Sequence, residues 1–125
     1  MTTSQVLVVE DNERNMKLFC DLLTASGYRT LEATTGERAV ELALEHAPDL
    51  VLMDIQLPGI DGVEALGRLR ADDRFASSPV LALTAQAMEG DRERFLAAGF
   101  DGYLSKPVNI GEFVATVRRY CDGSG

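Results

Sequence analysis

The sequence predicts an α/β domain in which five parallel strands form a doubly wound sheet of order 2-1-3-4-5 with five helices. Three observations predict it. Short apolar runs alternate five times with segments of helical periodicity. The connections between them are short, as expected for strand–helix–strand units. The chain has 125 residues, which suits one domain with a core. We expect that domain to span 1–121, followed by a short tail, 122–125.

Five apolar runs are predicted as strands. The first is nearly continuous, as expected for a strand buried on both faces. The second is weaker, with Leu31 and Ala33 alternating inward, which is typical of an edge strand. The five ranges are Gln5–Glu10, Arg29–Thr34, Leu50–Met53, Val80–Leu83 and Gly102–Leu104. In this order, which is the flavodoxin-like one, ligands bind in a crevice between the first and third strands.

Capping and breaking residues delimit the first two helices. Asn12 can cap the first helix, and Gly27 can stop it. Thr34 and Glu37 resemble a capping box for the second helix, which Pro48 ends.

The remaining three helices differ in how well they are marked. Asp61 can cap a helix that runs to about Ala71, and Asn109 with Glu112 opens the last helix. The fourth helix, expected over 87–98, is polar and contains a glycine, so we expect it to be the least stable. Periodicity predicts inward-facing side chains at Met16, Phe19, Cys20, Leu23, Val40, Ala43, Leu44, Ala47, Val63, Leu66, Leu69, Ile110, Phe113, Val114, Val117 and Cys121.

Composition excludes several functional classes. The formal net charge of −8 argues against direct binding to nucleic acid or to an anionic membrane. No apolar stretch approaches the length of a membrane span, and the N-terminus carries no basic region typical of a secretory signal. Cys20 and Cys121 lie far apart and form no CxxC motif. We therefore expect a cytoplasmic protein with free thiols.

Three acidic residues follow or end two apolar strands. Asp54 closes the run Leu50–Met53, and Glu10 and Asp11 close the first strand. A buried charge without a partner is costly, but the carboxyl ends of strands are where α/β sheets bind ligands. Three converging carboxylates need a cation, and hard oxygen ligands suit Mg²⁺. The sequence therefore predicts a magnesium site at this edge.

Two further polar side chains end strands at the same edge. Thr84 ends the fourth strand and offers a hydroxyl, and Lys106 follows the fifth and offers an ammonium. Carboxylates, a hydroxyl and a cation around one small volume suit phosphoryl transfer to a carboxylate, with Asp54 as nucleophile.

Four segments together resemble the receiver domain of two-component response regulators. They occur in the order and spacing of that family, and the similarity covers essentially the whole chain. The opening of the chain is most similar to single-domain receivers that control the cell cycle or cell polarity. The segments are Val8–Asn12, Leu52–Gly62, Leu83–Ala85 and Tyr103–Pro107.

The resemblance implies a role for each site residue. Asp54 would accept the phosphoryl group. Asp11, Asp54 and the backbone carbonyl of Gln56 would bind Mg²⁺, with Glu10 acting mainly through water. Lys106 would pair with the phosphoryl oxygens.

The resemblance also implies a switch. Thr84 would move toward the phosphoryl oxygens, and Tyr103 would rotate into the space it leaves. The peptide bond before Pro107 would be cis, as proline permits. Gln56 and Gln86 occupy positions that tune dephosphorylation in the family.

The implied partners are proteins. The phosphoryl group would come from a phosphohistidine on a sensor histidine kinase or a histidine phosphotransferase. The output would be a change in protein–protein contacts, through the face built from the fourth helix, fifth strand and fifth helix. We expect a single-domain regulator, a monomer, that acts in cell-cycle or polarity control. A phosphorelay shuttle and a chemotaxis-type regulator are the alternatives.

Each residue also has a simpler interpretation. Glu10 and Asp11 could cap the first helix, where acidic side chains interact favourably with the dipole. Asp54 could form an Asx turn, Lys106 could be a solvated surface charge, and Tyr103 could be ordinary core. A flavodoxin-type electron carrier, an aspartyl phosphohydrolase and an inactive receiver scaffold are rival functions, while the P-loop motif is absent.

Overall fold

The computed structural model describes residues 4–75, 78–85 and 90–121. The predicted tail 122–125, Gln86 and the first residues of the predicted fourth helix, 87–89, lie outside the described residues.

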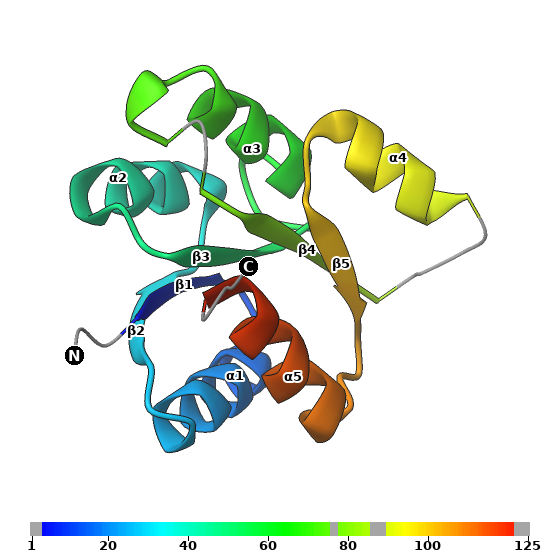
Figure 1. Cartoon of the computed structure of the whole chain (residues 1–125). Helices are drawn as coiled ribbons and strands as arrows, with labels where there is room; N and C mark the ends of the chain where they lie inside the picture. The colour runs from blue at the N-terminus through cyan, green and yellow to red at the C-terminus, as the bar shows by residue number, and fades with distance from the viewer. Residues whose placement is uncertain (1–3, 76–77, 86–89, 122–125) are drawn as a thin grey trace.

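The described strands form one parallel sheet of order β2-β1-β3-β4-β5, which confirms the predicted topology (Figure 1). Val6–Val9 of β1 pair with Leu50–Met53 of β3, so the two strands end side by side. That register brings residues 10–11 next to Asp54. The strands are β1 (Gln5–Val9), β2 (Arg29–Ala33), β3 (Leu50–Asp54), β4 (Val80–Thr84) and β5 (Gly102–Ser105).

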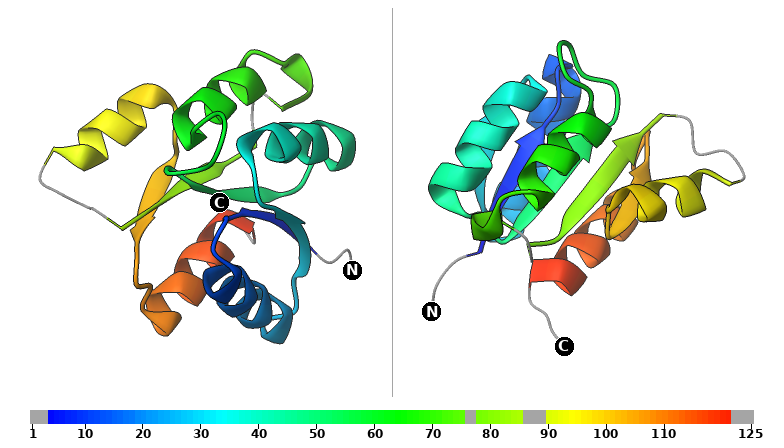
Figure 2. Two further views of the ribbon diagram at one scale, coloured as in Figure 1. Left: turned by 180° about the vertical axis from the view of Figure 1, so that it is seen from behind. Right: turned by 90° about the horizontal axis from the view of Figure 1, so that it is seen from above.

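Helices cover both faces of the sheet. Helices α2, α3 and α4 lie on one side and α1 and α5 on the other, and the reverse view shows the same two layers (Figures 1 and 2). A short 3-10 helix, Asp73–Phe75, follows α3. The helices are α1 (Glu13–Ala25), α2 (Gly36–His46), α3 (Gly62–Arg70), α4 (Asp91–Ala98) and α5 (Ile110–Cys121).

The two faces of the sheet support separate hydrophobic cores. Successive side chains of a strand point to opposite faces. In β1, Leu7 and Val9 therefore join the core under α2, α3 and α4, whereas Val6 and Val8 join the core under α1 and α5. In the second core, the rings of Phe19 and Phe113 stack 5.4 Å apart and join α1 to α5. Both faces are apolar, so β1 reads as a continuous apolar run.

Three predicted caps are confirmed. Asn12 accepts a hydrogen bond from the backbone amide of Asn15, Asp61 from Glu64, and Asn109 from Glu112. The capping box at Thr34 is wrong. Thr35 is the N-cap of α2 instead, and its hydroxyl accepts from the amide of Arg38. Helix α2 therefore begins at Gly36, one residue later than the predicted cap implies.

The predicted inward faces are correct in part. In α2, Ala39, Leu42 and Ala43 are buried, whereas Ala47 is exposed beyond the helix in a left-handed conformation. Periodicity gives the angle between side chains, and an error of one residue in register selects a neighbouring stripe.

Two other predicted core residues are exposed, Val63 at 41% and Ile110 at 58%. Each lies in the first turn of its helix. Helices that follow parallel strands begin at the edge of the sheet, where less apolar surface is available to cover a side chain.

Helix α4 begins at Asp91, and Gly90 precedes it in a left-handed conformation as the N-cap. Glycine adopts that conformation without strain, so Gly90 begins the helix rather than weakening its interior. Among the side chains described in α4, Phe95 is buried and Leu96 is 42% exposed, in line with the thin apolar stripe expected.

Candidate functional site

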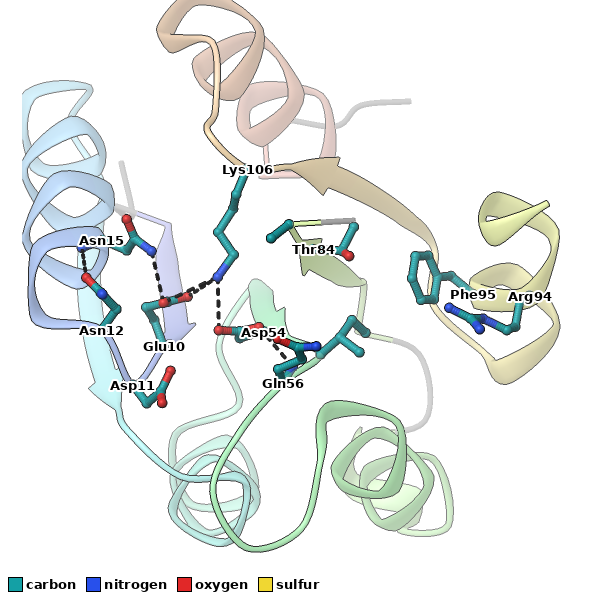
Figure 3. Close-up of a pocket in the computed structure, with 12 residues that line it drawn as sticks. Glu10, Asp11, Asn12, Asn15, Asp54, Gln56, Thr84, Arg94, Phe95 and Lys106 are labelled. Carbon is teal, nitrogen blue, oxygen red and sulfur yellow. Dashed lines mark hydrogen bonds and ion pairs between the residues drawn. The ribbon is translucent and has the colours of Figure 1, made fainter. Parts of the chain in front are cut away.

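A cavity of about 470 Å³ opens at the carboxyl ends of β1, β3, β4 and β5 (Figure 3). Because all the strand pairs are parallel, these carboxyl ends lie at the same edge of the sheet. Tyr103 is not in the cavity lining, and Gln86 lies outside the described residues. The other residues predicted to carry the chemistry line the cavity; they are Glu10, Asp11, Asp54, Gln56, Thr84 and Lys106.

The three predicted carboxylates converge. Glu10, Asp11 and Asp54 each offer an oxygen within 4.8 Å of the others. Glu10 and Asp54 are buried, at 1% and 4% exposed, whereas Asp11 is exposed. A cluster of carboxylate oxygens that is open on one side matches the ligands of Mg²⁺, which retains several waters when bound to protein. The donor set therefore fits that ion.

Lys106 bridges the two buried carboxylates. Its Nζ lies 3.0 Å from Oδ2 of Asp54 and 3.0 Å from Oε2 of Glu10. Burial alone would lower the pKa of Lys106, but the hydrogen bonds to Glu10 and Asp54 outweigh it and leave the pKa raised. The side chain therefore stays a cation, and the solvated-charge interpretation is wrong.

The pKa of Asp54 is raised from 3.8 to about 6, and burial is the largest cause. The neighbouring Glu10 also raises the pKa, whereas Lys106 and the backbone amide of Gln56 lower it. That amide donates a 3.0 Å hydrogen bond to Oδ1 of Asp54. The carboxylate thus accepts a backbone hydrogen bond in an Asx-type geometry and also faces the cavity, so the turn role and the site role coexist.

Asn15 is a site residue that no motif in the sequence indicated. Its side-chain amide donates a 3.1 Å hydrogen bond to Oε1 of Glu10 (Figure 3). Glu10 is therefore held between Asn15 and Lys106. The available signal was a polar residue in the first turn of a helix that starts beside the acidic pair, and such residues are too common to be diagnostic.

Thr84 and Tyr103 lie on the α4 side of the site. Thr84 is buried and lines the cavity, and its carbonyl accepts a 2.7 Å hydrogen bond from the amide of Lys106. Tyr103 is half-buried, and its ring packs 6.0 Å from that of Phe95. The Lys106–Pro107 peptide bond is cis, as expected.

Two residues of α4, Arg94 and Phe95, also line the cavity (Figure 3). The sequence did not predict these two residues as part of the site, because a weakly amphipathic helix does not reveal which side faces the sheet. Phe95 supplies an apolar wall, and Arg94 adds a second cation to a cavity otherwise rich in carboxylates.

The sequence model of the response regulator receiver domain matches residues 6–118 of the chain. The chain belongs to this family. The receiver is 49% identical over 118 residues to the polar-differentiation response regulator DivK of Brucella ovis, covering 94% of this chain and 96% of that protein. It is 50% identical over 115 residues to DivK of Brucella anthropi, covering 92% and 94%.

Solved receivers share its fold. The receiver domain of a sensor histidine kinase from Pseudomonas aeruginosa superposes with a TM-score of 0.89 at 36% identity, covering 98% of this chain and 100% of that chain. That structure holds a magnesium ion in its active-site cleft. A chemotaxis response regulator of Vibrio cholerae gives a TM-score of 0.89 at 26% identity, covering 95% and 99%. Membership makes the receiver a signalling protein of two-component systems.

None of the helices that the structure describes has the length and apolar character needed to cross a membrane.

Proposed function

We propose that the receiver is a phosphorylation-dependent switch in which Asp54 accepts a phosphoryl group from a phosphohistidine. The donor is a sensor histidine kinase or a histidine phosphotransferase. One observation carries the proposal: a buried carboxylate, Asp54, faces an open cavity while paired with a lysine at 3.0 Å. A purely structural ion pair would need no cavity, and an electron carrier would not place carboxylates where a flavin phosphate must bind.

The chemistry follows from these groups. An Asp54 carboxylate oxygen attacks the phosphorus, the P–N bond breaks, and the donor imidazole leaves with the electron pair and takes up a proton. Lys106 offsets charge on the phosphoryl oxygens, and Thr84 lines the same cavity. Glu10, Asp11, Asp54 and the carbonyl of Gln56 would hold Mg²⁺. When bound, the ion neutralises developing negative charge.

The raised pKa of Asp54 bears on this step. Protonation would remove the nucleophile, but a pKa of about 6 leaves the carboxylate largely ionised at neutral pH. Charge on Mg²⁺ would favour the ionised form further. Asp54 therefore meets both requirements of an acceptor, because it is ionised and accessible from the cavity.

The readout that we propose is a rearrangement around α4. Phosphorylation adds about −1.5 to −2 charge, which favours contacts from Thr84 and Lys106 to the new oxygens. Tyr103 would then turn inward. Its ring contact with Phe95 supports a coupling to α4. The output surface would be the face formed by α4, β5 and α5, which binds a downstream protein and not nucleic acid.

The relatives named as polar-differentiation response regulators support a role in cell-cycle or polarity control. We propose that the receiver acts there as a cytoplasmic monomer. The net charge of −8 supports protein partners over nucleic acid or anionic membranes.

The test is covalent labelling of Asp54. The chain is incubated with Mg²⁺ and acetyl phosphate and examined by mass spectrometry, with and without hydroxylamine. We expect one hydroxylamine-labile phosphoryl adduct that is lost in Asp54→Asn and retained in Asp73→Asn, an exposed carboxylate elsewhere. No adduct, or an equal adduct in Asp54→Asn, overturns the proposal.

A further inference from the structure

Arg94 of α4 lies in the lining of the cavity that contains Asp54. Most surface arginines extend into solvent. Arg94, in contrast, lines the same cavity as Asp54 and Lys106, at the wall formed by α4 (Figure 3). Its guanidinium carbon lies 5.3 Å from the centre of the Phe95 ring, a cation–π contact that restricts where the side chain points.

Phe95 anchors this part of α4. It is 2% exposed, its ring meets Phe100 edge-on at 6.1 Å, and it contacts Tyr103 at 6.0 Å. The backbone of Arg94 is therefore tied to a packed aromatic cluster, although Arg94 itself is an exposed residue. A shift of the guanidinium toward the cavity would pull on the same cluster that contains Tyr103.

The charges of the cavity leave a role for a second cation. Among the lining residues that the structure describes, Glu10, Asp11 and Asp54 are acidic, and Lys106 and Arg94 are basic. Lys106 is already shared between two carboxylates at 3.0 Å. A phosphoryl group replaces the single charge of Asp54 with about −1.5 to −2, so one lysine no longer balances the site.

Guanidinium geometry suits that excess charge. Arginine presents several N–H donors in a planar fork, which matches two phosphoryl oxygens at once, whereas lysine acts as a point charge. Lys106 contacts Asp54 from the β5 side, whereas Arg94 lies at the α4 wall of the same cavity, beside the ring of Phe95 (Figure 3). The two cations would thus contact different oxygens of one phosphoryl group.

We propose that Arg94 is a phosphoryl-contacting residue whose guanidinium pairs with the group carried by Asp54 and draws α4 toward the modified site. This inference rests on the proposed function, because it needs Asp54 to be the acceptor. It adds a direct link from the phosphoryl group to α4, alongside the path through Thr84 and Tyr103.

The experiment measures the binding of a phosphoryl-like anion and the binding of Mg²⁺ separately. Beryllofluoride, formed from beryllium and fluoride salts, serves as a phosphoryl mimic and is titrated into the full chain at saturating Mg²⁺, with binding followed by NMR. Mg²⁺ alone is titrated in parallel. The variants are Arg94→Gln, Arg94→Lys and the control Arg118→Gln, which removes an exposed charge on α5 outside the cavity lining.

We expect Arg94→Gln to weaken beryllofluoride affinity about three- to tenfold, a modest range because the side chain is exposed. Arg94→Lys should recover part of the loss, and Arg118→Gln should bind as the unsubstituted chain does. The affinity for Mg²⁺ alone should stay the same or rise in Arg94→Gln, because a like charge has been removed. A role confined to folding would instead weaken both ligands together.

The outcomes separate this inference from the proposed function. If Arg94→Gln binds beryllofluoride as tightly as Arg118→Gln does, the role of Arg94 is overturned while the acceptor role of Asp54 stands. A parallel loss of Mg²⁺ and beryllofluoride affinity in Arg94→Gln also overturns it. If the unsubstituted chain binds no beryllofluoride, the acceptor role fails, and the inference about Arg94 fails with it.

Discussion

The ammonium of Lys106 lies 3.0 Å from Oδ2 of Asp54, although the two residues are 52 positions apart in the sequence. The pair is mostly buried, with side chains 15% and 5% exposed. Lys106 also contacts Glu10, so one cation serves two buried carboxylates. The resting site therefore carries excess negative charge, and its stability should depend on pH, on Mg²⁺ and on the residues that shape the loop after Asp54.

The pH dependence follows from Asp54. Its folded pKa is raised from 3.8 to about 6, mainly by burial, so between these values the folded chain holds a proton that the unfolded chain has lost. The contribution of Asp54 to the free energy of unfolding is therefore fully present below the unfolded pKa of 3.8, and it is lost as the pH rises through about 6. We expect Asp54→Asn in EDTA to be more stable than the unsubstituted chain at neutral pH, by about 1–3 kcal/mol.

That advantage should shrink as pH falls from about 6 toward 3.8. Urea unfolding at several pH values measures it, and Asp73→Asn, which changes an exposed carboxylate, is the control. An Asp54→Asn variant that gains nothing at neutral pH would contradict a raised pKa.

Magnesium should stabilise the folded chain through the carboxylate cluster. A ligand at about 100 times its dissociation constant stabilises the folded state by about 2.7 kcal/mol. We expect most of this gain to disappear in Asp11→Asn, because Asp11 is exposed and its loss removes a ligand without disturbing the core. Thermal unfolding with MgCl₂, against NaCl of equal ionic strength, measures the gain. Glu13→Gln, which removes a nearby charge outside the cluster, should keep it, and an equal gain in Asp11→Asn would exclude Asp11 as a ligand.

Two glycines of α3 make a matched pair. A Cβ at Gly62 would overlap the carbonyl oxygen of Asp54, whereas a Cβ at Gly67 would meet nothing within 4 Å. We expect Gly62→Ala to destabilise the fold by about 1–3 kcal/mol through overpacking, and to weaken Mg²⁺ binding by moving Asp54. Gly67→Ala should stabilise it by about 0.5–1 kcal/mol. Urea unfolding and Mg²⁺ titration of both variants check this. If Gly62→Ala were as stable as Gly67→Ala and bound Mg²⁺ as tightly, the loop after Asp54 would tolerate the added Cβ.

Tyr103 should couple phosphorylation to the output face. We expect Tyr103→Ala to be phosphorylated on Asp54 normally but to lose the difference in partner affinity between the two phosphorylation states. Tyr103→Phe keeps the ring that packs against Phe95 and tests the hydroxyl separately. Pull-downs with treated and untreated chains give the measurement, and an unchanged affinity difference in Tyr103→Ala would end the coupling model.

Glu10 should depend on Asn15. Because Glu10 is 1% exposed and accepts from the Asn15 amide, Asn15→Ala leaves a buried carboxylate with one partner fewer. We expect a loss of about 1–3 kcal/mol in the free energy of unfolding, measured in urea without metal. Asn12→Ala removes a helix cap instead and should cost about 1 kcal/mol without affecting the Lys106–Glu10 contact. Equal stability of Asn15→Ala and the unsubstituted chain would mean that this hydrogen bond contributes nothing.

The sequence by itself determined the sheet and most of the site. Asp54, Thr84 and Lys106 each lie at or just after the end of an apolar run, and parallel strands bring such ends to one edge whatever the detailed packing. The order β2-β1-β3-β4-β5 then puts Glu10 and Asp11 beside Asp54. Chain order and strand direction suffice for that.

Only the tertiary structure decided how helices face the sheet. Periodicity fixes the angle between side chains on one helix but not the rotation of that helix against its neighbours. That rotation decides the exposure of Val63 and Ile110. It also decides the hydrogen bond from Asn15 to Glu10 and the place of Arg94 in the cavity lining. Packing in the two cores sets it, because contacts between residues distant in sequence form only when the whole domain closes.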